Sequence, residues 1–173
     1  MRLGVDEVGV TELMGVVEHS RALATAAAAL LLDSLDSERA LVSPAQPSAV
    51  DEPTRALLAE IGQWCEGAMG RPVVPALWRV LAHNPHYFEA TWAKERALMS
   101  DGTLAARDKR RTALGVAMAV RGRYMIEYDT AILRHAGDTD GDVLEILGVV
   151  DHYTTLNTLS EGMQIESDIR PPD

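Results

Sequence analysis

Residues Arg121–Gly137, which read RGRYMIEYDTAILRHAG, are the most informative stretch of the chain. Successive residues of a helix turn by about 100°, so a helix here places one acidic residue, Asp129, in an apolar stripe. A carboxylate on such a face either finds a partner or is desolvated, and desolvation raises its pKa. The expected stripe consists of Met118, Gly122, Met125, Ile126, Asp129, Ile132, Leu133 and Ala136.

Outward from this stretch, apolar residues at helical spacing predict helices along most of the chain, and no segment shows the sustained alternation typical of strands. Gly137 is expected to end the helix that contains Asp129. The predicted fold class is therefore all-α. The expected helices are 8–35 (one or two helices), 53–68 after the N-cap Asp51, 76–82, 85–99 after the N-cap Asn84, 104–136 with one break near Asp108, and 143–163.

Length and composition limit the classes of function. The chain of 173 residues suits one domain, and its formal net charge is −10. The short basic stretch Arg107–Arg111 contains no aromatic residues and is expected to be solvated or to lie at an interface. No nucleic-acid partner is therefore predicted. The longest apolar run, Ala22–Leu32, is too short to span a bilayer, and the N-terminus lacks a targeting signal. We therefore expect no membrane partner and a cytoplasmic location.

Cysteine and histidine usage predicts neither a disulfide nor a metal centre. Cys65 is the only cysteine, which excludes an intrachain disulfide, a Cys-x-x-Cys pair and a cysteine metal cluster. No tight His and carboxylate spacing such as His-Glu-x-x-His occurs. We therefore expect no metal and no other cofactor.

The chain contains an internal repeat. Glu12–His19 reads ELMGVVEH and Glu145–His152 reads EILGVVDH, and five of the eight positions are identical. The repeat predicts two copies of one helix, each with a glycine for close helix packing and a histidine one turn later. We expect a single domain, 1–173, made of an N-terminal half-repeat (1–36), a linker (37–53), a complete repeat (51–163) and a polar tail (164–173).

Three segments between Asp51 and Met163 resemble the carboxymuconolactone decarboxylase and alkyl hydroperoxidase D (AhpD) superfamily. LWRVLAHNPHYFEATW, 77–92, is similar to the helix–turn–helix at the family's entry. The family's Cys-x-x-Cys-x-x-x-His helix aligns without gaps with residues 116–137, VAMAVRGRYMIEYDTAILRHAG. VLEILGVVDHYTTLNTLSEGM, 143–163, resembles the helix that follows. The resemblance implies an AhpD-like bundle of antiparallel helices around a small pocket, and a homo-oligomer, commonly a dimer, trimer or hexamer.

The residues that carry the family's redox chemistry are replaced in this chain. The two cysteines fall on Gly122 and Met125, the histidine on Asp129, and the proton-relay glutamate on Arg110. Peroxide reduction by the family needs a thiolate and its dithiol partner. We therefore expect no dithiol peroxidase activity. The decarboxylase branch also lacks the cysteine pair, but it usually keeps a histidine at the position of Asp129.

An acid in an apolar wall can act as a general acid or base when its pKa approaches neutrality. The candidate catalytic residues are Asp129, His152 and Tyr124, where His152 would lie on the next helix and the tyrosine would donate a hydrogen bond to substrate. An arginine can anchor an acidic substrate by a bidentate contact. The candidate substrate-binding residues are Arg110, Arg121, His83, Tyr153 and Asn157. Each of these residues also has a purely structural interpretation.

Two functions remain open. The first is a cofactor-independent lyase, decarboxylase or isomerase that acts on a small organic acid or carbonyl compound through Asp129. The second is a non-catalytic family member that binds a small ligand or serves as an oligomeric scaffold. Convergence of Asp129 and His152 in a solvent-connected cavity would favour the enzyme, whereas an Asp129 sealed against an arginine would favour the scaffold.

Overall fold

The computed structural model describes residues 6–165 and confirms the all-α prediction, since this part of the chain contains no strand. None of its helices is both long and apolar enough to cross a membrane. The elements are α1 (Glu7–Ala29), the 3-10 helix η1 (Pro47–Ala49), α2 (Glu52–Met69), α3 (Ala76–Leu81), α4 (Pro85–Met99), α5 (Ala106–Ala119), α6 (Arg123–His135) and α7 (Asp140–Gly162).

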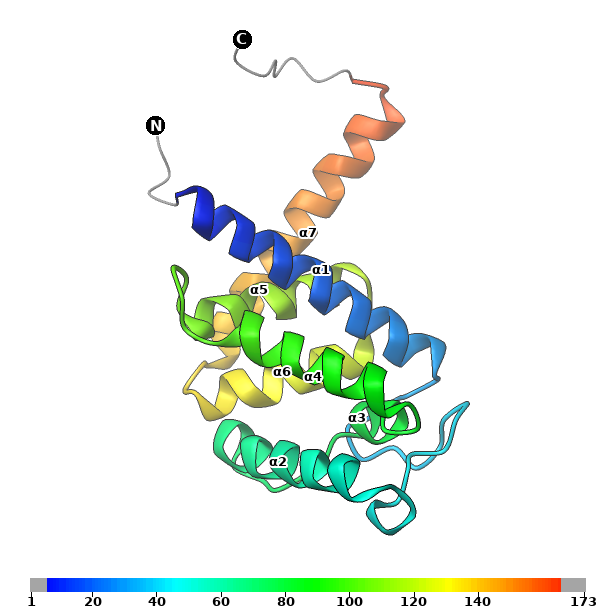
Figure 1. The fold of residues 1–173 in the computed structure, drawn as a ribbon. Helices are drawn as coiled ribbons and strands as arrows, with labels where there is room; N and C mark the ends of the chain where they lie inside the picture. The colour runs from blue at the N-terminus through cyan, green and yellow to red at the C-terminus, as the bar shows by residue number, and fades with distance from the viewer. Residues whose placement is uncertain (1–5, 166–173) are drawn as a thin grey trace.

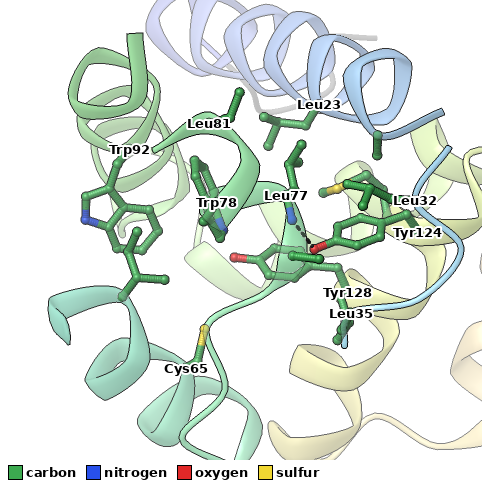
Figure 2. Close-up of a cluster of buried hydrophobic side chains, with 14 of the residues drawn as sticks. Leu23, Leu32, Leu35, Cys65, Leu77, Trp78, Leu81, Trp92, Tyr124 and Tyr128 are labelled. Atoms are coloured by element: carbon green, nitrogen blue, oxygen red, sulfur yellow. Dashed lines mark hydrogen bonds between the residues drawn. The ribbon is translucent and has the colours of Figure 1, made fainter. Parts of the chain in front are cut away.

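Helices α5 and α6 form the centre of the bundle. Helix α1 packs across both of them, α2 packs on the other side of α6, and α4 contacts α1, α3 and α5 (Figure 1). The core between these helices is rich in aromatic side chains (Figure 2). Helix α7 packs mainly against α5, and its second half stands clear of the other helices (Figure 1).

The predicted helix caps explain where several helices begin and end. The Asp51 side chain accepts a hydrogen bond from the Thr54 N–H at 3.0 Å, and Asn84 accepts one from the Tyr87 N–H at 3.2 Å. Gly137 has a φ of 93°, the left-handed conformation that follows many helix C-termini. All three caps were predicted from the sequence and are confirmed.

The break in the predicted 104–136 helix lies elsewhere than expected. Asp108 is in the first turn of α5, and the helix instead ends at Ala119, with α6 beginning at Arg123. Two features cause the break: Arg121 has a φ of 56°, and a Cβ on Gly122 would lie 2.9 Å from the Cβ of Ala24 on α1. The break therefore lies where α1 approaches closely. Such a contact between distant segments cannot be predicted from the local sequence.

The first predicted helix also ends earlier than expected. Helix α1 stops at Ala29, Leu31 adopts a φ of 58°, and Leu32 and Leu35 are buried from a loop. These apolar residues are buried but not helical, so the prediction that the helix continues to residue 35 was wrong. In the predicted tail, residues 166–173 lie outside the described residues.

The basic stretch Arg107–Arg111 is only partly solvated: Arg107 and Asp108 are exposed, as expected, but the next two residues are not. Lys109 and Arg110 are buried. Arg107 and Arg111 both bind the buried carboxylate of Asp138, which holds the end of α6 against α5. The stretch is therefore neutralised by acids of its own chain.

Candidate functional site

Four ionisable side chains from four helices form a continuous buried network, which is called the charge network below and consists of His19, Glu95, Arg110 and Asp129. The Arg110 guanidinium donates from Nη1 to Asp129 Oδ1 and from Nη2 to Glu95 Oε1, each at 2.9 Å. The other oxygen of Glu95, Oε2, lies 2.9 Å from His19 Nε2. The four side chains are between 0 and 6% exposed. The network thus joins α1, α4, α5 and α6 beneath the protein surface.

Helical spacing places these polar groups on otherwise apolar faces. On α4 the buried residues are Phe88, Trp92, Glu95 and Met99, which are separated by four, three and four positions. Asp129 occupies the equivalent kind of position on α6. The spacing that marked Asp129 would therefore have identified Glu95 as well, although our sequence analysis did not single it out.

Aromatic rings enclose the guanidinium of Arg110. Its central carbon lies 5.9 Å from the Trp64 ring and 5.5 Å from the Tyr128 ring, distances typical of cation–π contacts. Trp64 stacks on Tyr128 with 6.4 Å between ring centroids and meets Trp92 edge-on at 5.5 Å. The charge network is therefore held in a rigid and largely apolar surrounding.

The two acids of the network respond to this surrounding in opposite ways. Burial raises the pKa of Asp129 from 3.8 to about 7, although the nearby Arg110 acts against this rise. Burial also disfavours the charged form of Glu95, but Arg110 and His19 together outweigh it and lower its pKa to about 2. Burial thus outweighs the attraction of Arg110 at Asp129 but not at Glu95, so the pKa values of the two carboxyl groups are shifted in opposite directions.

Two polar atoms of the site have no hydrogen-bond partner among the described residues. They are Asp129 Oδ2 and the Tyr128 hydroxyl, and both are buried. Such orphaned atoms are uncommon in proteins, and each costs about 1–3 kcal/mol. The site therefore presents an acceptor or acid and a hydroxyl that are free to bind something else.

Two surface clefts lie beside the charge network. Glu95 lines a cleft of about 690 Å³, and Arg110 lines another of about 350 Å³. Trp64 and Met99 line both clefts. Asp129 itself lines neither cleft.

The structure joins two of the predicted site residues and separates the others. Asp129 and Arg110 are in direct contact. His152 is exposed on α7, whereas its counterpart in the internal repeat, His19, belongs to the charge network. The repeat therefore relates His152 to a histidine of the network, and the catalytic role of His152 stays a prediction.

The remaining candidates for substrate binding are dispersed. Tyr153 and Asn157 line a surface groove along α7. The His83 ring contacts the Ser43 carbonyl at 2.9 Å and thereby holds the linker, and Arg121 is exposed at the α5–α6 break. Their roles in binding a substrate stay predictions.

Tyr124 has a structural contact that the sequence did not indicate. Its hydroxyl accepts a hydrogen bond from the buried Leu77 N–H at 2.9 Å (Figure 2). Burial raises the pKa of this tyrosine, although the hydrogen bond from Leu77 acts in the opposite direction. The hydroxyl thus links the start of α3 to α6.

Replacing Tyr124 with phenylalanine is expected to lower the free energy of unfolding by about 1–3 kcal/mol, because the Leu77 N–H then lacks an acceptor. Urea denaturation of the variant measures this loss. Y128F is the matched control: its hydroxyl has no partner, so its removal should leave stability unchanged or raise it slightly. Equal losses in both variants would contradict the assignment.

Cys65 is buried beside the same core, with its side chain between α2 and the rings around it (Figure 2). Burial raises the pKa of its thiol to about 12. The reactive thiolate is therefore scarce at neutral pH.

Comparisons with known proteins give two matches. Residues 85–165 match the model of the carboxymuconolactone decarboxylase family. Among solved structures, the chain is similar to the alkylhydroperoxidase AhpD core from Rhodospirillum rubrum, with a TM-score of 0.58 and 24% sequence identity, over 69% of this chain and 90% of that chain. No curated protein gives a significant match.

The helical architecture and the family match together define the class of this protein as an AhpD-like all-α fold. Residues 85–165 are thus similar in sequence to the carboxymuconolactone decarboxylase family, and the fold is similar to that of the AhpD core. The family match begins at Pro85, so Glu95, Arg110 and Asp129 lie inside it, whereas His19 comes from outside it.

Proposed function

We propose that this protein is a cofactor-independent enzyme that transfers a proton on a small organic acid or carbonyl compound, as a lyase, decarboxylase or isomerase, with Asp129 as the acid or base. The observation that carries the proposal is the state of Asp129. One carboxylate oxygen is fixed by Arg110, while the other is buried without a partner. With a pKa of about 7, the residue can both accept and release a proton under neutral conditions.

The energetic cost of the site also supports a functional role. A buried ion network contributes little net stability compared with apolar residues of similar volume. Here the cost is increased by the two orphaned atoms, Asp129 Oδ2 and the Tyr128 hydroxyl. Costs of this kind collect at functional sites. A network that served stability alone would be expected to satisfy both atoms.

The proposed chemistry uses only groups of this chain. Ionised Asp129 takes a proton from the carbon next to a substrate carbonyl, and the electron pair of that C–H bond moves to the carbonyl oxygen. Arg110, which contacts Asp129 directly, would stabilise the resulting enolate. Return of the proton to the same or another carbon completes an isomerisation. For a 3-oxo acid, loss of CO₂ forms the enolate, and neutral Asp129 protonates it.

Access to Asp129 is expected to depend on Trp64. This side chain is half-buried, covers Arg110 and separates the two clefts that the network borders. A rotation of its ring would expose the guanidinium first, and Arg110 would then hold the carboxylate of an acidic substrate. The dithiol reaction is not proposed, because the chain has a single cysteine and it is buried.

Proton exchange tests the proposal without knowledge of the natural substrate. Pyruvate, 2-oxobutyrate and acetoacetate are incubated with the protein in D₂O near neutral pH, and proton NMR follows the loss of the α-proton signals and the conversion of acetoacetate to acetone. We expect exchange of at least one probe to be about 100-fold or more faster with the wild type than with D129N, which is the usual contribution of a general acid or base.

E127Q is the matched control, since Glu127 is an exposed acid on the same helix and loses the same charge. This variant should exchange protons at the wild-type rate. Equal rates for D129N and the wild type would remove Asp129 as the acid or base.

A second candidate function is supported by the complete burial of Asp129 and its contact with Arg110, the arrangement that the sequence analysis associated with a scaffold, and by the exposure of His152 on α7. In this case the chain is a non-catalytic family member that acts as a ligand-binding or scaffold protein. Wild-type protein that exchanges none of the probes would favour this candidate over the enzyme.

A further inference from the structure

Arg110 divides its guanidinium between two acids. Its Nη1 donates to Asp129 and its Nη2 donates to Glu95, each at 2.9 Å, so each acid receives a single hydrogen bond from it. Arginine frequently holds one carboxylate with two parallel hydrogen bonds, which is the stronger arrangement. The division therefore accounts for the free oxygen of Asp129, since Oδ2 is buried and has no hydrogen-bond partner in the described part of the chain.

Glu95 is held from its other side by His19. The second oxygen of Glu95, Oε2, lies 2.9 Å from His19 Nε2, and both side chains are only 3% exposed. With Oε2 engaged by the histidine, Glu95 presents Oε1 to Arg110 and does not turn both oxygens toward it. The histidine thus determines how much of the guanidinium Glu95 takes.

The N-terminal half-repeat supplies this histidine. On α1, His19 belongs to a buried face that also includes Val16, Ser20 and Leu23, and α1 packs across α5 and α6. The other copy of the repeat has its histidine, His152, exposed on α7. Because α1 precedes the residues that match the family model, the contact with Glu95 depends on a part of the chain outside that match.

We propose that Glu95 and His19 are positioning residues for Asp129: they hold half of the Arg110 guanidinium away from it, so that one oxygen of Asp129 stays free for proton transfer. The inference rests on the proposed function of Asp129 as the acid or base. Without Glu95, Arg110 would close on Asp129 with both nitrogens, cover Oδ2 and hold the carboxylate ionised.

The groups around Asp129 act on its pKa in the directions that this arrangement requires. Burial raises the pKa of Asp129, Arg110 lowers it, Glu95 raises it and His19 lowers it. The neighbouring Tyr128 stays neutral, because burial raises its pKa well above the ordinary value. Burial also disfavours ionised Glu95, but Arg110 and His19 outweigh it and lower its pKa to about 2. Glu95 therefore competes for the guanidinium throughout the neutral range.

A carbon-13 NMR titration of the Asp129 carboxyl group in E95Q tests the inference, with the signal assigned by comparison with D129N. The midpoint of the titration is expected to fall by at least about one pH unit, a tenfold loss of proton affinity, because the neutral amide competes less for Arg110. E89Q is the matched control. Glu89 is an exposed acid on the same helix, so this variant should keep the wild-type midpoint.

H19F is expected to shift the midpoint in the opposite direction. Glu95 Oε2 then loses its partner and turns toward Arg110, which leaves less of the guanidinium for Asp129 and raises the midpoint by a few tenths of a pH unit or more. H19Q keeps a donor for Oε2 and should lie closer to the wild type. The pair H19F and H19Q gives an answer even if E95Q does not fold.

A merely structural role would move E95Q and H19F in the same direction, because looser packing admits water and lowers the midpoint of Asp129 in both. A fall in both variants, or an unchanged midpoint in E95Q, would overturn the inference.

The titration needs no substrate, so the two proposals fail separately. Wild-type protein that exchanges none of the probes, with midpoints that shift as expected, would contradict the enzyme but support the positioning by Glu95 and His19. Active wild-type protein with the same midpoint in E95Q would overturn the positioning alone. If both proposals hold, E95Q should exchange protons about tenfold more slowly than the wild type near neutral pH.

Discussion

Replacement of Arg110 by methionine is expected to lower the free energy of unfolding by about 3–5 kcal/mol, the cost of leaving buried charges without a partner. Arg110 is the single cation that both Glu95 and Asp129 contact, and its side chain is 6% exposed. Its removal leaves two acids in an apolar surrounding. Chemical denaturation at neutral pH measures the loss.

Two variants make this result specific. R134M breaks an ion pair with Asp140 that is largely exposed, so its loss should stay below about 1 kcal/mol. The triple variant E95Q/R110M/D129N removes both acids together with the cation and should recover part of the lost stability. An R110M variant as stable as R134M would contradict the buried network.

The stability of the protein is expected to fall by a few kcal/mol as the pH rises from about 4 to about 7. The pKa of Asp129 is 3.8 as a free group and about 7 in the folded protein, so in this window the folded state holds a proton that the unfolded chain has released. Raising the pH therefore favours unfolding, and each tenfold change in proton affinity is worth about 1.4 kcal/mol.

Glu95 acts in the opposite direction at lower pH. Its pKa falls from 4.5 to about 2 on folding, so stability is lost as the pH drops through this range. Together the two acids give a stability maximum near pH 4–5. Unfolding by urea at a series of pH values measures this profile.

D129N isolates the contribution of Asp129. The variant should lose the decline between pH 4 and pH 7 and be more stable than the wild type at pH 8, because the asparagine need not ionise in a buried site. E127Q, which loses the same charge at an exposed position, should keep the wild-type profile. Parallel profiles for D129N and the wild type would show that Asp129 does not titrate in this window.

The elements of the fold were largely predictable from local signals. Capping by Asp51, Asn84 and Gly137, together with apolar spacing, identified most helices and several of their ends. The errors arose where distant segments determine the backbone. The break at residues 120–122 follows from the contact of Gly122 with Ala24, almost a hundred residues earlier in the chain.

The candidate site was predictable only in part, for a related reason. Asp129 was identified by its position in an apolar helical stripe, and the superfamily resemblance maps a reactive histidine onto it and a relay glutamate onto Arg110. In this chain the two side chains are in contact, and each carries the opposite charge to the family residue that it replaces. Glu95 and His19 complete the network from α4 and α1, and only the fold brings them to it. The repeat paired His19 with His152, but the sequence could not tell which copy would be buried.

The most direct test of the account is a carbon-13 NMR titration of the Asp129 carboxyl group, assigned by the loss of its signal in D129N. The account predicts a pKa of about 7, caused by burial that the contact with Arg110 does not fully offset. A titration below pH 4 would contradict it, because Asp129 would then be a permanently ionised partner of Arg110 and could not exchange a proton under neutral conditions.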